Sequence, residues 1–84
     1  MNMKIMIIDS TNKREMIDIN ENDSISKLKE LIKIKKGINT DDIVLHFNGE
    51  ILEVNQKISD YDIENNSQII YTGKFRGGIP YKYF

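Results

Sequence analysis

The feature that most constrains this chain is a single helix with clear start and stop signals. Asp23 and Ser24 precede an apolar stripe at helical spacing, and the serine is the expected N-cap. Lysines occupy the last turns, where positive charge suits the helix dipole. Gly37 predicts a left-handed C-cap, and Ile38 is placed to pack back on the helix. The stripe that the rest of the chain has to cover comprises Ile25, Leu28 and Ile32.

A strand hairpin is predicted before this helix. Residues 3–8 favour a strand, and a second strand follows with Ile17 and Ile19 facing inward. Between them, residues 9–13 are polar turn material, in which Asn12 can adopt the left-handed conformation that a bulged hairpin needs. On the first strand the residues predicted to face inward are Met3, Ile5 and Ile7.

Further strands are predicted after the helix. Residues 43–47 alternate cleanly, and Asn48-Gly49 predicts a type I′ turn into a short strand at residues 50–52. Residues 59–63 favour a short irregular helical turn, and residues 68–74 favour the last strand. The inward-facing residues are Ile43, Leu45, Phe47, Ile69 and Tyr71. The order of elements predicts an α+β fold, a mixed sheet packed on one helix, with residues 1–75 as one domain and residues 76–84 as a tail.

Composition limits the function further. The net charge of −1 and the pI near 5.8 give no basic face for nucleic acid. The absence of cysteine excludes disulfides and thiol catalysis, and one histidine with no paired catalytic side chain disfavours an enzyme. No apolar run approaches the roughly 18 residues of a membrane span. We therefore expect a cytoplasmic monomer that binds neither nucleic acid, membrane nor metal.

The pattern of residues 3–78 resembles ubiquitin without a gap. The shared features are Gly37-Ile38, the Leu-x-Phe-x-Gly segment ending at Gly49, the Ser-Asp-Tyr segment at residues 59–61, and Arg76-Gly77-Gly78. This resemblance implies the ubiquitin-like β-grasp fold, which agrees with the predicted order of elements. It also implies that Lys29 corresponds to the partly buried helix lysine of the family, which has a structural role.

The resemblance implies a protein modifier made as a precursor. A processing protease would remove residues 79–84, and the Gly78 carboxylate would become the acyl donor, with Gly77 as its slender neighbour. An activating enzyme would use ATP to adenylate that carboxylate, and a conjugating enzyme would join it to a lysine of a target protein. The modifier itself binds no cofactor. Arg76 and Lys74 would be the basic contacts of the tail, although Lys74 lacks the planar fork of the arginine found there in ubiquitin.

The outer sheet face departs from ubiquitin. The three apolar residues of the ubiquitin recognition patch fall here at Ser10, His46 and Thr72, so that patch is lost. An isoleucine and the histidine have in effect exchanged places across two strands. Strand periodicity predicts one shifted apolar face, which Met6 and Met16 extend toward the first hairpin. The predicted partner-binding residues of this face are Ile8, Val44, His46, Ile70 and Thr72.

Alternatives remain open at this point. Gly77-Gly78 can end the fold as a plain linker followed by an inert segment, and the apolar face can reflect an isoleucine-rich composition. The chain can also be a non-covalent interaction module that uses the outer face, or, less in keeping with the sequence, a sulfur carrier of the same fold. If the source is eukaryotic, the nucleus joins the cytoplasm as an expected location.

Overall fold

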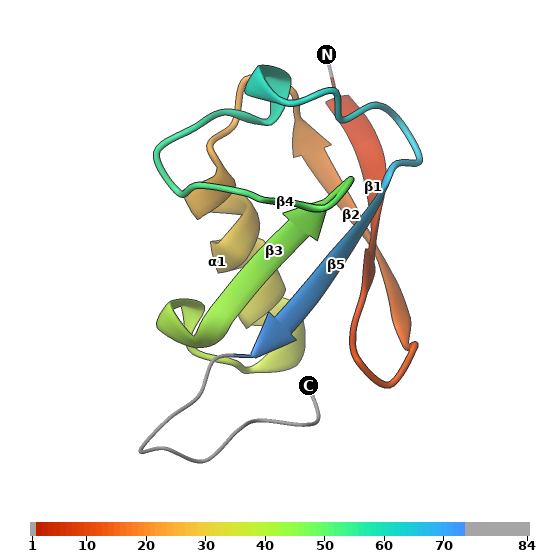
Figure 1. Cartoon of the computed structure of the whole chain (residues 1–84), viewed down its shortest axis with the longest axis vertical. Coiled ribbons are helices and arrows are strands. Elements are labelled where there is room, and N and C mark those ends of the chain that lie inside the picture. The colour runs from red at the N-terminus through yellow and green to blue at the C-terminus, as the bar shows by residue number, and fades with distance from the viewer. Residues whose placement is uncertain (1, 74–84) are drawn as a thin grey trace.

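One helix lies against one face of a twisted sheet (Figure 1). The computed structural model describes residues 2–73. The sheet has five strands in the order β2-β1-β5-β3-β4. The strands are β1 (Asn2–Ile8), β2 (Arg14–Asn20), β3 (Ile43–Phe47), β4 (Glu50–Ile51) and β5 (Gln68–Gly73).

The sheet is mixed because its central pair is parallel. β1 and β5 run side by side in the same direction, with Ile7 opposite Ile69. The other neighbours are antiparallel: β1 with β2, β3 with β5, and β3 with β4. The first and last strands of the described chain therefore form the middle of the sheet.

The helix α1 (Ile25–Lys36) has the predicted caps at both ends. The Ser24 hydroxyl accepts a hydrogen bond from the Lys27 amide at 3.0 Å. Gly37 has φ of 71°, and its amide donates to the Lys33 carbonyl at 2.7 Å. A left-handed residue is strained for any side chain with a Cβ, so glycine is the natural stop.

The core lies between the helix and the inner sheet face. Ile25, Leu28 and Ile32 of α1 are buried, as their spacing predicted. They pack in one cluster with the inward residues of the strands, and Ile38 and Phe47 pack partly buried against it. From the sheet the fully buried side chains include Ile5, Ile7, Ile43, Leu45, Ile69 and Tyr71.

Some bounds differ from the sequence-based prediction. The helical turn after β4 is η2 (Ile58–Asp60), which begins one residue earlier than the predicted turn at residues 59–63 and ends three residues earlier. It begins earlier because Ile58 is buried in the core and the Lys57 amide donates to the Asp60 carboxylate at 2.8 Å. It ends earlier because the backbone is already extended at Tyr61. A second short turn, η1 (Thr40–Asp42), precedes β3 and was not predicted. The last strand is described as far as Gly73, and Lys74 lies outside the described residues.

Candidate functional site

A single row of side chains crosses the outer face of all five strands. Ile8 of β1 is opposite Arg14 of β2 on one side and opposite Ile70 of β5 on the other. Ile70 is opposite His46 of β3, and His46 is opposite Ile51 of β4. We call this set, Arg14, Ile8, Ile70, His46 and Ile51, the outer row.

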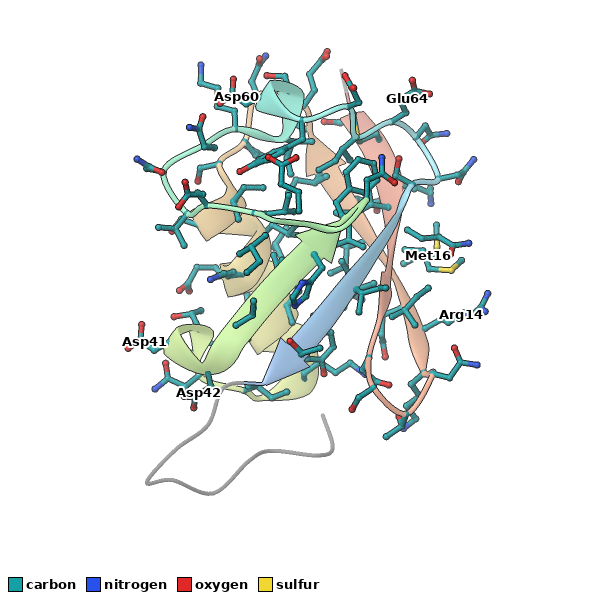
Figure 2. All side chains as sticks on the ribbon, viewed as in Figure 1. Arg14, Met16, Asp41, Asp42, Asp60 and Glu64 are labelled. Carbon is teal, nitrogen blue, oxygen red and sulfur yellow. The ribbon has the colours of Figure 1, made fainter. Side chains whose placement is uncertain are left out.

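Two shorter sets of residues flank the outer row. On one side Met16, Met6 and Gln68 follow each other across β2, β1 and β5. On the other side Thr72 is opposite Val44. Because side chains two residues apart on a strand share a face, both sets lie on the same surface as the outer row. Figure 2 shows Arg14 and Met16 projecting from β2, an edge strand of the sheet.

The apolar members of this face are open to solvent. Ile51 keeps 59% of its surface exposed, Ile70 49% and Met16 41%. Ile8, Val44 and Met6 are half-buried. Contiguous exposed apolar side chains on a small domain usually mark an interaction surface. The structure therefore brings the five residues predicted for this face, Ile8, Val44, His46, Ile70 and Thr72, together on one surface, and their role in binding stays a prediction.

The histidine is held within that surface by its neighbour. The imidazole Nε2 of His46 lies 3.1 Å from the hydroxyl of Thr72 across β3 and β5, and the tautomer decides which of the two donates. This contact fixes the ring between Ile70 and Ile51 of the outer row. A polar ring in an apolar row gives the surface one hydrogen-bonding group at its centre.

Charged groups frame one side of the face. Lys4 and Asp18 form an exposed ion pair at 3.6 Å, two strand positions beyond the Met6 and Met16 pair. Such an exposed pair adds little stability. Arg14 ends the outer row as its one cation. The outer row itself contains no carboxylate.

Two residues of the outer row were missed from the sequence. Neither Arg14 nor Ile51 was assigned to a face of the sheet. The Asn48-Gly49 turn, with φ of 53° and 78°, joins β3 and β4 with two residues and fixes His46 opposite Ile51. That turn was predicted, so its register was the signal that would have placed Ile51.

The buried carboxylate of Asp9 stabilises the turn that follows β1, directly after Ile8. Asp9 is only 5% exposed, and its Oδ1 accepts from the Thr11 amide at 2.9 Å, the Thr11 hydroxyl at 2.6 Å and the Lys13 amide at 2.9 Å. Burial acts to raise the pKa of Asp9, but these hydrogen bonds and one from Lys36 outweigh it and hold the pKa below its usual value. Sequence reasoning treated Asp9 only as turn material.

The same charges act on a buried tyrosine of β5. Burial first, and then the carboxylates of Asp9 and Glu15, raise the pKa of Tyr71 to about 12. Lys36 contacts both carboxylates, at 3.4 Å for Asp9 and 3.7 Å for Glu15. The cluster joins β1, β2, β5 and α1 on the inner side of the sheet, so we assign it to stability.

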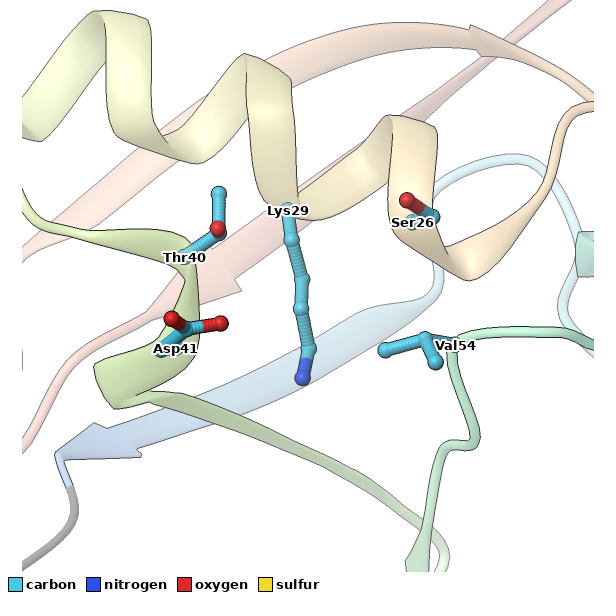
Figure 3. A pocket seen from close by; sticks show the side chains of 5 residues that line it. All are labelled: Ser26, Lys29, Thr40, Asp41 and Val54. Atoms are coloured by element: carbon cyan, nitrogen blue, oxygen red, sulfur yellow. The ribbon is translucent and has the colours of Figure 1, made fainter.

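A cavity of about 280 Å³ lies between α1 and η1 (Figure 3). The Lys29 side chain extends into it, with Asp41 and Thr40 on one side and Val54 and Ser26 on the other. This position, between the helix and the segment before β3, agrees with the structural role expected of Lys29. The lining offers one carboxylate and no histidine, so it provides no acid–base pair of the kind that hydrolases use.

Within residues 2–73, three or more histidine, cysteine, aspartate or glutamate side chains nowhere gather closely enough to hold a metal ion. In the same part of the chain, no helix has the length and apolar character needed to cross a membrane.

The tail residues predicted for conjugation, Lys74, Arg76, Gly77 and Gly78, lie outside the described residues, as does the predicted boundary between residues 1–75 and 76–84. Their roles stay predictions.

The hairpin, the single helix and the returning parallel strand define a β-grasp domain of the ubiquitin type. The family model of the ubiquitin family matches residues 5–76, which is most of the chain. The chain belongs to the ubiquitin family. Domains of this family are in general non-enzymatic modifiers or interaction modules. The resemblance inferred from the sequence and the predicted fold class are both confirmed.

Proposed function

We propose that this protein is a ubiquitin-like modifier that is cleaved after Gly78 and joined through that glycine to lysines of target proteins. The observation that carries the proposal is the position of Arg76-Gly77-Gly78. The family match ends at Arg76, and the two glycines follow directly. A glycine pair behind a complete β-grasp domain presents a carboxylate without side-chain hindrance.

The chemistry needs no catalytic group from the modifier. Hydrolysis of the peptide bond between Gly78 and Ile79 leaves the Gly78 carboxylate and a free amine on Ile79. ATP then adenylates the carboxylate with release of pyrophosphate, and an enzyme cysteine displaces AMP to form a thioester. The amine of a target lysine displaces that thiol and forms an isopeptide bond. ATP is thus a substrate of the activating enzyme, and the proposed partners are the protease, the activating and conjugating enzymes, and the targets.

The distance in sequence between the last described strand residue and Gly78 supports access of enzymes to that glycine. β5 is described to Gly73, at the end of the sheet where β3 begins, because Gly73 is opposite Ile43. Gly78 is therefore five positions beyond the last described strand residue. We propose the cytoplasm as the compartment, with the nucleus added in a eukaryotic source.

The first test is the intact mass of the protein recovered from its own cells. A mass that ends at Gly78, together with Gly-Gly remnants on lysines of other proteins, is the expected result. Protein that retains residues 79–84, with no conjugated species, would overturn the proposal. A sulfur carrier would instead give a Gly78 thiocarboxylate, which differs from the carboxylate by the mass of one oxygen-to-sulfur exchange.

A second candidate function is non-covalent binding through the outer face. The apolar outer row favours it, because Ile51 and Ile70 are each about half exposed or more. In that case Ile70→Asp abolishes partner capture, whereas Gly78→Ala does not. A modifier that also uses this face to meet its enzymes is affected by both substitutions, and its conjugates are lost in each.

A further inference from the structure

We propose that the open edge of β2 pairs with the β2 edge of a second copy of this chain, antiparallel and about a two-fold axis at Met16. The two sheets would then join into one continuous sheet, with both outer rows on the same side. The pairing does not depend on conjugation through Gly78, so it can fail while the proposed function holds. The monomer expected from the sequence would be the species at low concentration.

One side of β2 has no strand beside it. Within residues 2–73, β2 lies at one end of the strand order and pairs with β1 alone. The Asp9 amide donates to the Lys13 carbonyl at 3.0 Å, so these two residues form a hydrogen-bonded pair of the hairpin. Such pairs recur at every second residue, so the backbone groups of the odd-numbered residues of β2 point toward β1. The residues whose N–H and C=O groups point to the open edge are Arg14, Met16, Asp18 and Asn20.

The far end of this edge is already occupied. The Asn20 amide donates to the Asp23 carboxylate at 3.1 Å, and the Asn20 carbonyl accepts from the Asp23 amide at 2.9 Å. The turn before α1 thus takes the groups that Asn20 would offer to another strand. Arg14, Met16 and Asp18 are left as the open part of the edge, with Met16 at its centre. Open backbone groups of this kind are a template for an added strand.

The open edge is complementary to itself in one antiparallel register. When Met16 is opposite Met16 of the second copy, Arg14 of each copy is opposite Asp18 of the other. All of these pairs then exchange backbone hydrogen bonds, and each copy gains a cross-strand pair of opposite charges. Arg14 makes no ion pair with any described residue. Asp18 contacts Lys4 of β1 at 3.6 Å but keeps 77% of its side chain exposed, so a second cation can approach from the open side.

Other registers lose this complementarity. A shift by two residues in one direction places Asp18 opposite Met16 and Arg14 opposite Asn20, whose backbone groups are occupied. The shift in the other direction places Arg14 opposite Met16 and Asp18 opposite Asn12, which lies in the turn with φ of 66°. A shift by one residue sets groups that point to the open edge against groups that point toward β1.

The centre of the proposed contact is apolar and accessible. Met16 keeps 41% of its surface exposed. Figure 2 shows Met16 and Arg14 projecting from β2, at the edge of the sheet opposite β4. Methionine is unbranched and flexible, so two of these side chains can pack against each other at the axis. Pairing there leaves Ile70 and Ile51 of the outer row open to other partners.

The pairing would make the outer face bivalent. Opposite residues of paired strands share a face, so both outer rows lie on one side of the joined sheet. A partner with two binding segments would engage both rows, and its second contact would gain from a high effective concentration. The edge contact is short and falls below the roughly 1,200 Å² of stable complexes, so we expect a transient dimer with a Kd of about 0.1–1 mM.

The test follows backbone amide spectra and the rotational correlation time of the 84-residue chain across the expected Kd, from about 0.05 to about 2 mM. The amide signals of Arg14, Met16 and Asp18 are expected to move with concentration. By mass action the mean correlation time should rise about 1.5- to 2-fold. Spectra and correlation times that stay constant would overturn the proposal, as would shifts confined to Ile70 and Ile51, which would place the second copy on the outer row.

Charge exchange tests the register. Arg14→Asp and Asp18→Arg each set like charges against each other in a self-pair, so each variant alone is expected to associate at least about tenfold more weakly. Mixed in equal amounts, the two variants are expected to associate again, because every charge at the contact then meets its opposite. Asp62→Arg, at an exposed residue outside the sheet, makes the same charge change as Asp18→Arg and should leave association unchanged.

Two outcomes would assign the edge differently. If the mixture of the two variants stays monomeric while the wild type associates, the proposed register is wrong. If the chain stays monomeric but a synthetic peptide of residues 14–20 shifts the β2 signals, the edge accepts an extended foreign segment and not a second copy. The spectra report self-association and the intact mass reports cleavage after Gly78, so the two proposals are tested separately.

Discussion

The carboxylate Oδ2 of Asp9 lies 3.4 Å from the ammonium Nζ of Lys36, which is 27 residues away in the sequence. The two side chains keep only 3% and 14% of their surface exposed. Their contact joins the turn after β1 to the last turn of α1. Since Ile8 immediately precedes Asp9, the same contact fixes the end of β1, where the outer row crosses it.

Lys36→Met is expected to destabilise the domain by about 1–3 kcal/mol, because it leaves a buried carboxylate without its cation. The methionine keeps the apolar stem, so packing is little changed. Urea unfolding at neutral pH measures the loss. Lys33→Met, at an exposed lysine of the same helix, serves as the control and should stay within about 0.5 kcal/mol of the wild type. Equal effects of the two substitutions would contradict a specific role for the Asp9 and Lys36 pair.

The lowered pKa of Asp9 predicts that the domain loses stability in acid. A carboxyl with a lowered folded-state pKa contributes stability above its unfolded value, about 3.9, and that contribution is lost as the pH falls through the folded value. Asp9→Asn should therefore be less stable than the wild type at neutral pH. The difference in unfolding free energy should shrink as the pH falls below about 4. Parallel pH profiles of the two proteins would rule out this linkage.

The raised pKa of Tyr71 predicts that the domain also loses stability at alkaline pH. Because the folded-state pKa is about 12, the contribution of this residue is fully present below the unfolded value of about 10 and is lost as the pH rises through about 12. Thermal unfolding followed between these values should show a steeper loss in the wild type than in Tyr71→Phe. If both proteins lose stability in parallel, other groups cause the alkaline transition.

The Ser24 cap predicts a measurable contribution to the helix. Ser24→Ala removes the acceptor of the Lys27 amide and is expected to cost about 1 kcal/mol. Ser26→Ala, two residues later within the same helix, provides the control, and alanine there should be neutral or slightly stabilising. Chemical unfolding of the three proteins decides the point, and a Ser26→Ala effect as large as that of Ser24→Ala would argue against capping.

The conjugation site proposed at Gly78 predicts a loss of function without a loss of fold. Gly78→Ala should abolish conjugates in cells, because a methyl group obstructs a groove shaped for glycine, while the unfolding midpoint stays unchanged. Gly73→Ala is the matched control: Gly73 lies in β5 and is absent from the glycines with positive φ in the described residues. Immunoblots for conjugated species give the readout. Undiminished conjugates in Gly78→Ala would place the acyl donor elsewhere.

The sequence by itself determined the local elements and the faces of the strands. Ser24 and Gly37 bounded the helix, and the alternation along β1, β3 and β5 placed Ile8, Val44, His46 and Ile70 on the outer side. These features depend on neighbours a few residues apart, which cap chemistry and the two-residue strand period describe well.

Only the tertiary structure decided which of those residues stand side by side. The parallel pairing of β1 with β5 sets Ile8 beside Ile70, and a shift by one residue would have turned one of them inward. The outer row with Arg14 and Ile51 depends on that register, as does the contact of Asp9 with Lys36. Such contacts join segments far apart in the chain, so packing of the whole core fixes them and local sequence patterns do not.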